Sequence, residues 1–109
     1  MQLFNLREHY SEKYQEYILG SAATGRHSVY LFSGEVSRHA SKMTTPDGHD
    51  EILLLLSGTA LLEDGQQRLT LQPEQAVALN PEESFTFTAL EDCRYLVAGT
   101  HTGAHAHEH

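Results

Sequence analysis

His49 and Glu51 are the residues whose types and spacing most clearly suggest chemistry, because they stand directly before an apolar run, Ile52 to Leu56. Residues two apart in a strand project to the same face, so the imidazole and the carboxylate are expected to point together. Such a pair suits a borderline transition metal, and the carboxylate alone could act as a general base. The competing interpretation is that Glu51 starts a strand near solvent and pairs with Arg38 or Lys42.

His39, twelve residues before Glu51, is a third candidate ligand. If the turn at 46–48 lets the segment 35–45 pair with the next strand, His39 would complete a three-ligand metal cluster with His49 and Glu51. The cofactor would then be a divalent transition metal such as Zn, Ni, Fe or Mn. The alternative is that these histidines are solvated polar residues near a turn. Met43 shares the predicted face of His39 and is expected to point inward with it.

A second group of histidines lies in the last nine residues, where His101 is followed by three more at alternate positions: His105, His107 and His109. In an extended chain the alternate imidazoles would share one side and could bind zinc, nickel or copper. The alternative is a tail without a role or one derived from a vector.

Phe85 and Phe87 alternate with threonines in the segment SFTF, which gives one aromatic and one hydroxylic face. These rings could line a site for an apolar or ring-shaped ligand, or they could be ordinary core. We expect Met43, Glu51, Phe85 and Phe87 to line the same interior.

Composition limits the classes of partner. With 109 residues the chain forms one domain, and a net charge of −8 leaves no basic stripe for nucleic acid. No apolar run is long enough to span a membrane, and residues 1–13 lack the features of a signal peptide, so we expect a cytoplasmic protein. Lone Cys93 is expected to be a buried, inert thiol rather than a reactive one.

These candidates are positioned by short strands. Strands are expected over 14–20, 27–34, 35–45, 50–57, 76–81, 84–90 and 93–99, and residues 59–71 predict a hairpin that turns at Asp64 and Gly65. The run 50–57 is apolar at consecutive positions, which predicts burial on both faces. Short strands with turns every eight to twelve residues are typical of an all-β antiparallel sandwich or barrel.

The order of these strands and two motifs resemble the cupin family of small jelly-roll barrels. Glu51, six intervening residues and Gly58 match the second half of the family's first motif, and 71–87 is similar to its second motif, with Pro81 at the loop proline. The resemblance implies a single-domain antiparallel jelly-roll barrel over 25–100, preceded by an N-terminal arm and strand at 1–24 and followed by the His-rich tail at 101–109. It also implies a homodimer paired through the N-terminal strand.

In the cupin family, two histidines and a glutamate of the first motif and one histidine of the second hold a divalent metal. Glu51 matches the glutamate, but the expected histidine positions, 43–47 and 84–87, contain no histidine.

The sequence therefore predicts a cupin that binds a small molecule in its barrel, with the metal site largely lost. Two alternatives remain open. One is a metal-dependent enzyme of the dioxygenase or isomerase type that uses His39, His49, Glu51 and His101. The other is metal handling by the tail. No catalytic residue is assigned.

Overall fold

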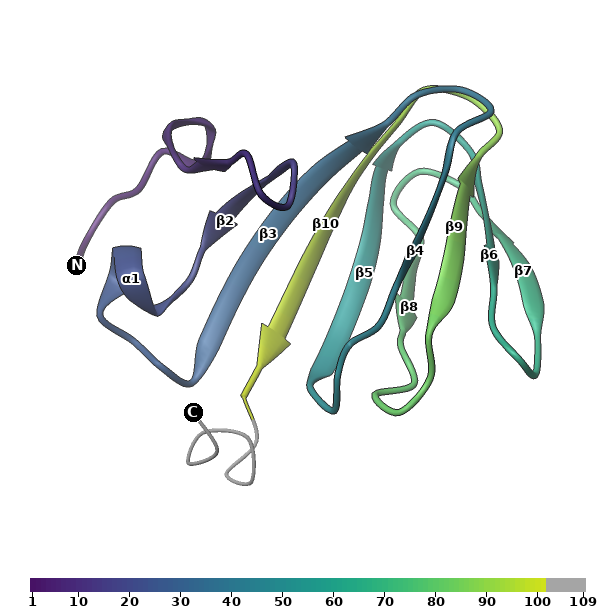
Figure 1. The fold of residues 1–109 in the computed structure, drawn as a ribbon. Coiled ribbons are helices and arrows are strands. Elements are labelled where there is room, and N and C mark those ends of the chain that lie inside the picture. Colours follow the sequence, from purple (N-terminus) through teal and green to yellow (C-terminus); the bar gives the residue numbers. More distant parts are fainter. Residues whose placement is uncertain (102–109) are drawn as a thin grey trace.

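Antiparallel strands dominate the computed structural model, which describes residues 1–101 (Figure 1). The prediction of an all-β antiparallel fold is confirmed. The described elements, in chain order, are η1 (Leu6–Glu8), β1 (Tyr10–Ser11), β2 (Glu16–Leu19), α1 (Ser21–Thr24), β3 (Val29–Val36), β4 (Ser41–Thr44), β5 (Asp50–Ser57), β6 (Ala60–Glu63), β7 (Arg68–Leu71), β8 (Ala76–Ala78), β9 (Phe85–Ala89) and β10 (Cys93–Thr100). Neither of the helices described in this range is long and apolar enough to cross a membrane.

Two sheets face each other across the interior. One has the order β1-β2-β3-β10-β5-β8 and the other β4-β9-β6-β7, so consecutive strands often lie in different sheets. The expected N-terminal arm is part of this fold, because β2 pairs with β3 and so widens the larger sheet. The predicted hairpin forms as β6 and β7, joined by a four-residue loop in which the Asp64 carboxylate accepts hydrogen bonds from the Gln66 and Gln67 amides.

Part of the apolar core fills one end of the two sheets, and the rest, including Leu53, Phe87 and Val97, extends along their inner faces. The most deeply buried side chains of that one end come from the ends or beginnings of strands that meet there: Val36, Leu55, Ala60, Leu71, Ala89 and Cys93. Gly58, the glycine of the motif, closes this end with a φ of +86°, and a Cβ there would collide with the Asp92 carbonyl. The Cys93 thiol donates to the carbonyls of Thr59 and Glu91, and burial raises its pKa, as expected for an inert thiol. We call this region the packed end.

Strand β4 differs from its prediction in its length and in which of its side chains point inward. The predicted polar strand 35–45 is interrupted by a turn at 37–40, and only Ser41–Thr44 pairs, with β9. Lys42 and Thr44 face the interior, whereas Met43 points outward and is 74% exposed, so the expectation that Met43 lines the barrel is wrong. The inversion has a physical cause: the Lys42 ammonium finds acceptors inside the barrel, which lets a charged residue take the inner face.

The prediction that β5 is buried on both faces is also wrong. Leu53 and Leu55 are buried inside, but Ile52 is 54% exposed on the outer face of the larger sheet. It belongs to an apolar row that crosses five neighbouring strands through paired residues: Leu19, Leu31, Ala98, Ile52 and Ala78. An exposed apolar row of this kind is typical of a surface that contacts another protein.

We predict that this row pairs two copies of the chain, because the same apolar surface on each copy can bury the other around a two-fold axis. Ile52→Lys places a charge at its centre and should halve the molar mass measured by light scattering at micromolar concentration. Thr70→Lys, on the exposed side of β7, is the matched control and should leave the mass unchanged. A monomeric wild-type chain would contradict the prediction.

Candidate ligand cavity and its tyrosine–carboxylate pairs

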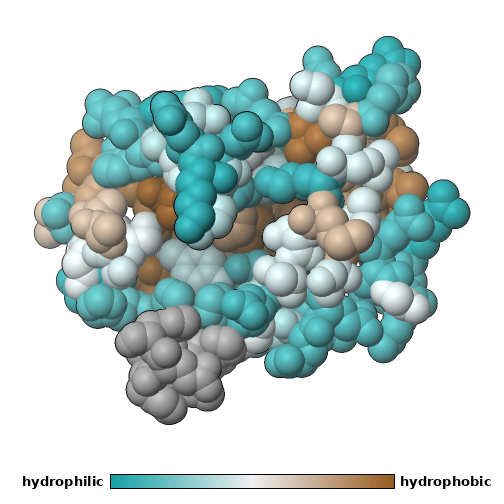
Figure 2. Space-filling model, viewed as in Figure 1, coloured by the Kyte–Doolittle hydropathy of each residue, from teal (hydrophilic) through white to brown (hydrophobic). Residues whose placement is uncertain are grey.

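A cavity of about 1020 Å³ occupies the half of the barrel opposite the packed end and extends under the N-terminal segment 8–11. Figure 2 shows a hollow on this face, with apolar residues visible between hydrophilic rims. Seven tyrosine and phenylalanine residues contribute to the wall: Tyr10, Tyr14, Tyr30, Phe32, Phe85, Phe87 and Tyr95. The polar side chains that line the cavity come from both sheets and from the turn between β4 and β5.

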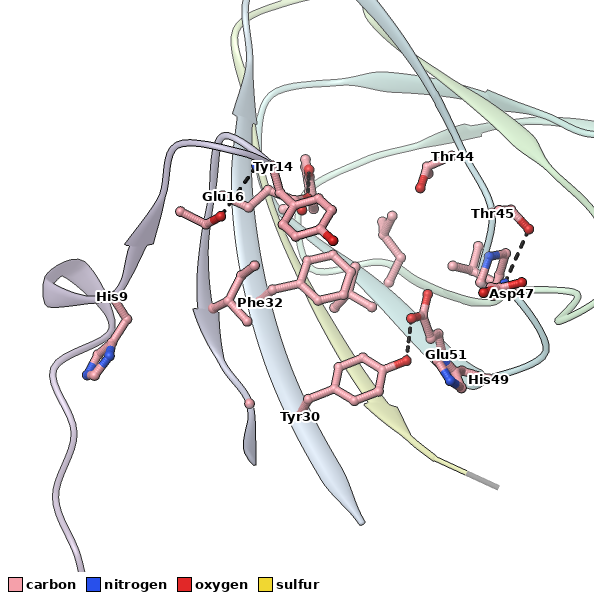
Figure 3. Close-up of a pocket in the computed structure, with 18 of the residues that line it drawn as sticks. His9, Tyr14, Glu16, Tyr30, Phe32, Thr44, Thr45, Asp47, His49 and Glu51 are labelled. Carbon is pink, nitrogen blue, oxygen red and sulfur yellow. Dashed lines mark hydrogen bonds between the residues drawn. The ribbon is translucent and has the colours of Figure 1, made fainter. Parts of the chain in front are cut away.

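The most distinctive contact is made by Tyr30, Gly99 and Glu51, which lie in one row across β3, β10 and β5. Gly99 has no side chain, so the Tyr30 ring lies across its backbone, where a Cβ would overlap the ring. The Tyr30 hydroxyl therefore reaches the strand beyond and donates a 2.5 Å hydrogen bond to Glu51 Oε2, drawn as a dashed line in Figure 3.

A second row repeats this arrangement in the opposite direction. Tyr95 on β10 lies across Gly34 on β3, and its hydroxyl donates to the carboxylate of Glu16 on β2. The Lys42 ammonium joins this pair from the other sheet, 2.8 Å from the Tyr95 hydroxyl and 3.3 Å from Glu16 Oε2. The side chain of Glu16 is only 13% exposed, so its charge is compensated inside the barrel by Lys42.

Glu51 lies in a different electrostatic setting. Burial raises the pKa of its carboxyl, the hydrogen bond from Tyr30 lowers it, and the charge of Glu16 raises it again, with a net upward shift. Burial, followed by the bond to Glu51, raises the pKa of Tyr30, so this hydroxyl stays protonated as a donor. The sequence suggested Arg38 or Lys42 as the partner of Glu51, but the observed partner is Tyr30, and Lys42 pairs with Glu16 instead.

His49 and His101 meet beside this pair at the open end of the barrel. His101 Nδ1 lies 3.2 Å from His49 Nε2, and the two rings contact edge to face, with centroids 4.6 Å apart. Both imidazoles also pack against the Tyr30 ring. Two histidines that are 52 residues apart in sequence thus share one wall of the cavity with Glu51.

His39 does not join them. It lies in the turn between β3 and β4 with a φ of 71°, and its amide bonds to the Ala89 carbonyl at the packed end. The predicted cluster of His39, His49 and Glu51 is therefore not formed, because the full length of the barrel separates His39 from the other two. Phe85 and Phe87 line the cavity. His105, His107 and His109 lie outside the described residues.

The residues do not fit the four-ligand metal site that the cupin resemblance implies. Rings of Phe85 and Phe87 occupy the segment where the second-motif histidine would stand, and 43–47 contributes no imidazole. Within residues 1–101, no group of three or more His, Cys, Asp or Glu side chains is arranged to hold a metal ion. The site is instead built from two tyrosine–carboxylate pairs.

Sequence reasoning missed Tyr30, Tyr95, Glu16 and Lys42 as cavity residues. A signal existed: β3 contains Tyr30-Leu-Phe-Ser-Gly34 and β10 contains Tyr95-Leu-Val-Ala-Gly99, the same pattern of tyrosine, leucine and a glycine four residues after the tyrosine. When two such strands pair antiparallel in register, each tyrosine lies opposite the glycine of its partner.

Glu51→Gln tests the electrostatic cost of this site. Because folding raises the pKa of Glu51, its ionised form destabilises the folded state, and that cost is present above the folded pKa and disappears below the unfolded pKa. The variant keeps an acceptor for Tyr30 and removes the charge, so at pH 7 it should be at least as stable as wild type. The difference should vanish near pH 4 in urea unfolding. A clear loss of stability at pH 7 would contradict the shift.

No family model matches the chain, and no curated protein matches it. Solved structures do match. Ectoine synthase from P. lautus aligns with a TM-score of 0.75 and 19% identity over 99% of this chain and 85% of that one.

Two further matches carry the cupin name. A cupin protein from Bacteroides fragilis has a TM-score of 0.69 at 14% identity, covering 82% of this chain and 78% of that one. A cupin superfamily protein from Desulfitobacterium hafniense has a TM-score of 0.66 at 17% identity, covering 81% and 79%. At these identities the likeness concerns the fold. The chain therefore has the cupin fold, an antiparallel jelly-roll barrel, as its sequence predicted.

Proposed function

We propose that this protein binds a small organic molecule inside its barrel and that the metal site associated with the fold has been replaced by tyrosine–carboxylate pairs. The observation that carries the proposal is the cavity itself. Its volume of about 1020 Å³ lies at the upper end of the usual range for small-molecule sites. Aromatic walls with a few converging polar groups are typical of such sites.

The positions of the polar groups support recognition rather than packing. Tyr30, Glu51, His49 and His101 all meet at the open end of the cavity, where a bound molecule would contact them. The similarity to an ectoine synthase shows that this barrel shape also occurs in an enzyme, and Glu51 beside a tyrosine hydroxyl would be suited to proton transfer. Binding is the function that the geometry supports best, and catalysis would be an addition to it.

Adjacent residues of β4 provide a matched test of binding in the cavity. Thr44 lines the cavity and Met43 points outward, so Thr44→Trp should fill the site while Met43→Trp should leave it open. Fragments that bind wild type in ligand-observed NMR should bind Met43→Trp equally and Thr44→Trp at least tenfold more weakly. Equal binding to all three proteins, with both variants folded by circular dichroism, would place the fragments elsewhere and contradict the proposal.

A metal-dependent enzyme of the dioxygenase or isomerase type is the second candidate, and the contact between His49 and His101 favours it. Two nitrogens that bind one zinc ion tetrahedrally at about 2.0–2.1 Å lie roughly 3.3 Å apart. The observed 3.2 Å is close to this value, although it is equally a hydrogen-bond distance. The described residues supply no three-ligand group, so the main proposal expects no stoichiometric metal at this position.

Metal analysis decides between the two candidates when the tail is removed first. A chain that ends at His101 should contain well below one transition metal per chain, measured by mass spectrometry after dialysis against zinc, nickel, iron or manganese. A stoichiometric metal that is lost in both His49→Ala and His101→Ala would support the enzyme instead. Metal in the full chain that disappears on truncation would identify the tail as the metal-handling segment.

A further inference from the structure

We infer that the cavity selects a ligand with a positively charged organic amine and that Glu51 binds the ammonium group. This inference rests on the proposed function and names the chemical class of the ligand. It follows from a difference between the two tyrosine–carboxylate pairs. Each is a tyrosine hydroxyl that donates to a glutamate, but only one of the two glutamates is paired with a lysine.

The first difference is the presence of a cation. Glu16 and Tyr95 are joined by Lys42, so that end of the cavity already holds a compensated ion pair. Glu51 and Tyr30 have no such partner: Glu51 makes no ion pair with any residue that the structure describes. A partly buried carboxylate that is paired only with a neutral hydroxyl is unfavourable, and a ligand cation would supply the missing charge.

The second observation is the overall charge of the wall. Four acidic side chains line the cavity: Glu8, Glu16, Asp47 and Glu51. Among the lining residues Lys42 is the single lysine or arginine. The chain as a whole carries a net charge of −8. The acidic excess of the cavity wall and the negative net charge of the chain would both repel an anionic ligand and attract a cationic one during association.

The aromatic rings distinguish an organic cation from a metal ion. Tyr30 and Phe32 are stacked at a 13° interplanar angle with centroids 6.1 Å apart, on the inner face beside Glu51. Figure 3 shows Phe32, Tyr30 and Glu51 pointing toward the same space. Ring faces attract an ammonium group through cation–π contact and also pack against its carbon substituents. Hard metal ions such as Ca²⁺ and Mg²⁺ need several oxygen ligands, which a single carboxylate does not provide.

Three probes of nearly equal shape test this inference: benzylamine, benzyl alcohol and benzoate, which are positive, neutral and negative at pH 7. Isothermal titration of the full-length protein should show benzylamine binding at least tenfold more tightly than benzyl alcohol, with benzoate weakest. In Glu51→Gln, benzylamine should weaken by roughly tenfold, as expected for loss of one charge-assisted contact, and benzyl alcohol should weaken much less. Glu35→Gln removes the same charge from an exposed position near the packed end, and it should preserve the preference.

The inference is overturned if benzyl alcohol or benzoate binds as tightly as benzylamine, if the preference survives in Glu51→Gln, or if none of the probes binds. The proposed function has a separate outcome, because it depends on whether Thr44→Trp blocks neutral fragments. Neutral fragments that are lost in Thr44→Trp, together with no amine preference, would leave the binding cavity established and the ligand class wrong.

Discussion

The absence of a side chain at Gly34 and Gly99 is the constraint on which the rest of the site depends. Each glycine leaves room for a tyrosine ring to lie across the backbone of β3 or β10, and the hydroxyl then reaches a carboxylate on the next strand. A larger residue at either position would push the ring into the space now occupied by the cavity. Because both glycines belong to one strand pair, the register between β3 and β10 fixes both pairs together.

This construction separates two tasks between the ends of the barrel. At the packed end, small and aliphatic side chains such as Leu55, Ala60 and Ala89 fill the interior completely, and burial of that apolar surface stabilises the fold. At the open end, polar side chains line the cavity, among them Tyr30, Glu51, His49 and His101. At the other end of the cavity, nearer the packed end, the ion pair between Lys42 and Glu16 bridges the two sheets. A partly buried Glu51 without a cation is unfavourable for the isolated chain, which is common at binding sites.

The fold was accessible from sequence because it depends on patterns along the chain. Alternation predicted the strand of Phe85 and Phe87, and the resemblance of the Glu51-to-Gly58 spacing to the cupin motif implied the barrel. The sequence was less informative about which side chains point into the barrel and which residues pair with each other. Both depend on contacts between residues that are distant in sequence. Met43 was expected inside because it shares a strand face with His39, yet Lys42 takes that place because Glu16 and Tyr95, 26 and 53 residues away, supply its acceptors. His39 was misplaced because a turn shortened β4. The two Tyr-Leu-x-x-Gly segments predict that each tyrosine lies opposite a glycine only once the register between β3 and β10 is known.

The packed end has a consequence for how such a protein can diverge. Since the residues of the packed end lie away from the cavity opening, exposed residues that border the opening, including Glu8, Tyr10, Thr45 and Asp47, can change without disturbing that end. Variation there would alter which molecules enter, while variation at Gly58 or Cys93 would affect only whether the chain folds. The two ends can therefore evolve at different rates, and a new preference can arise on an unchanged barrel.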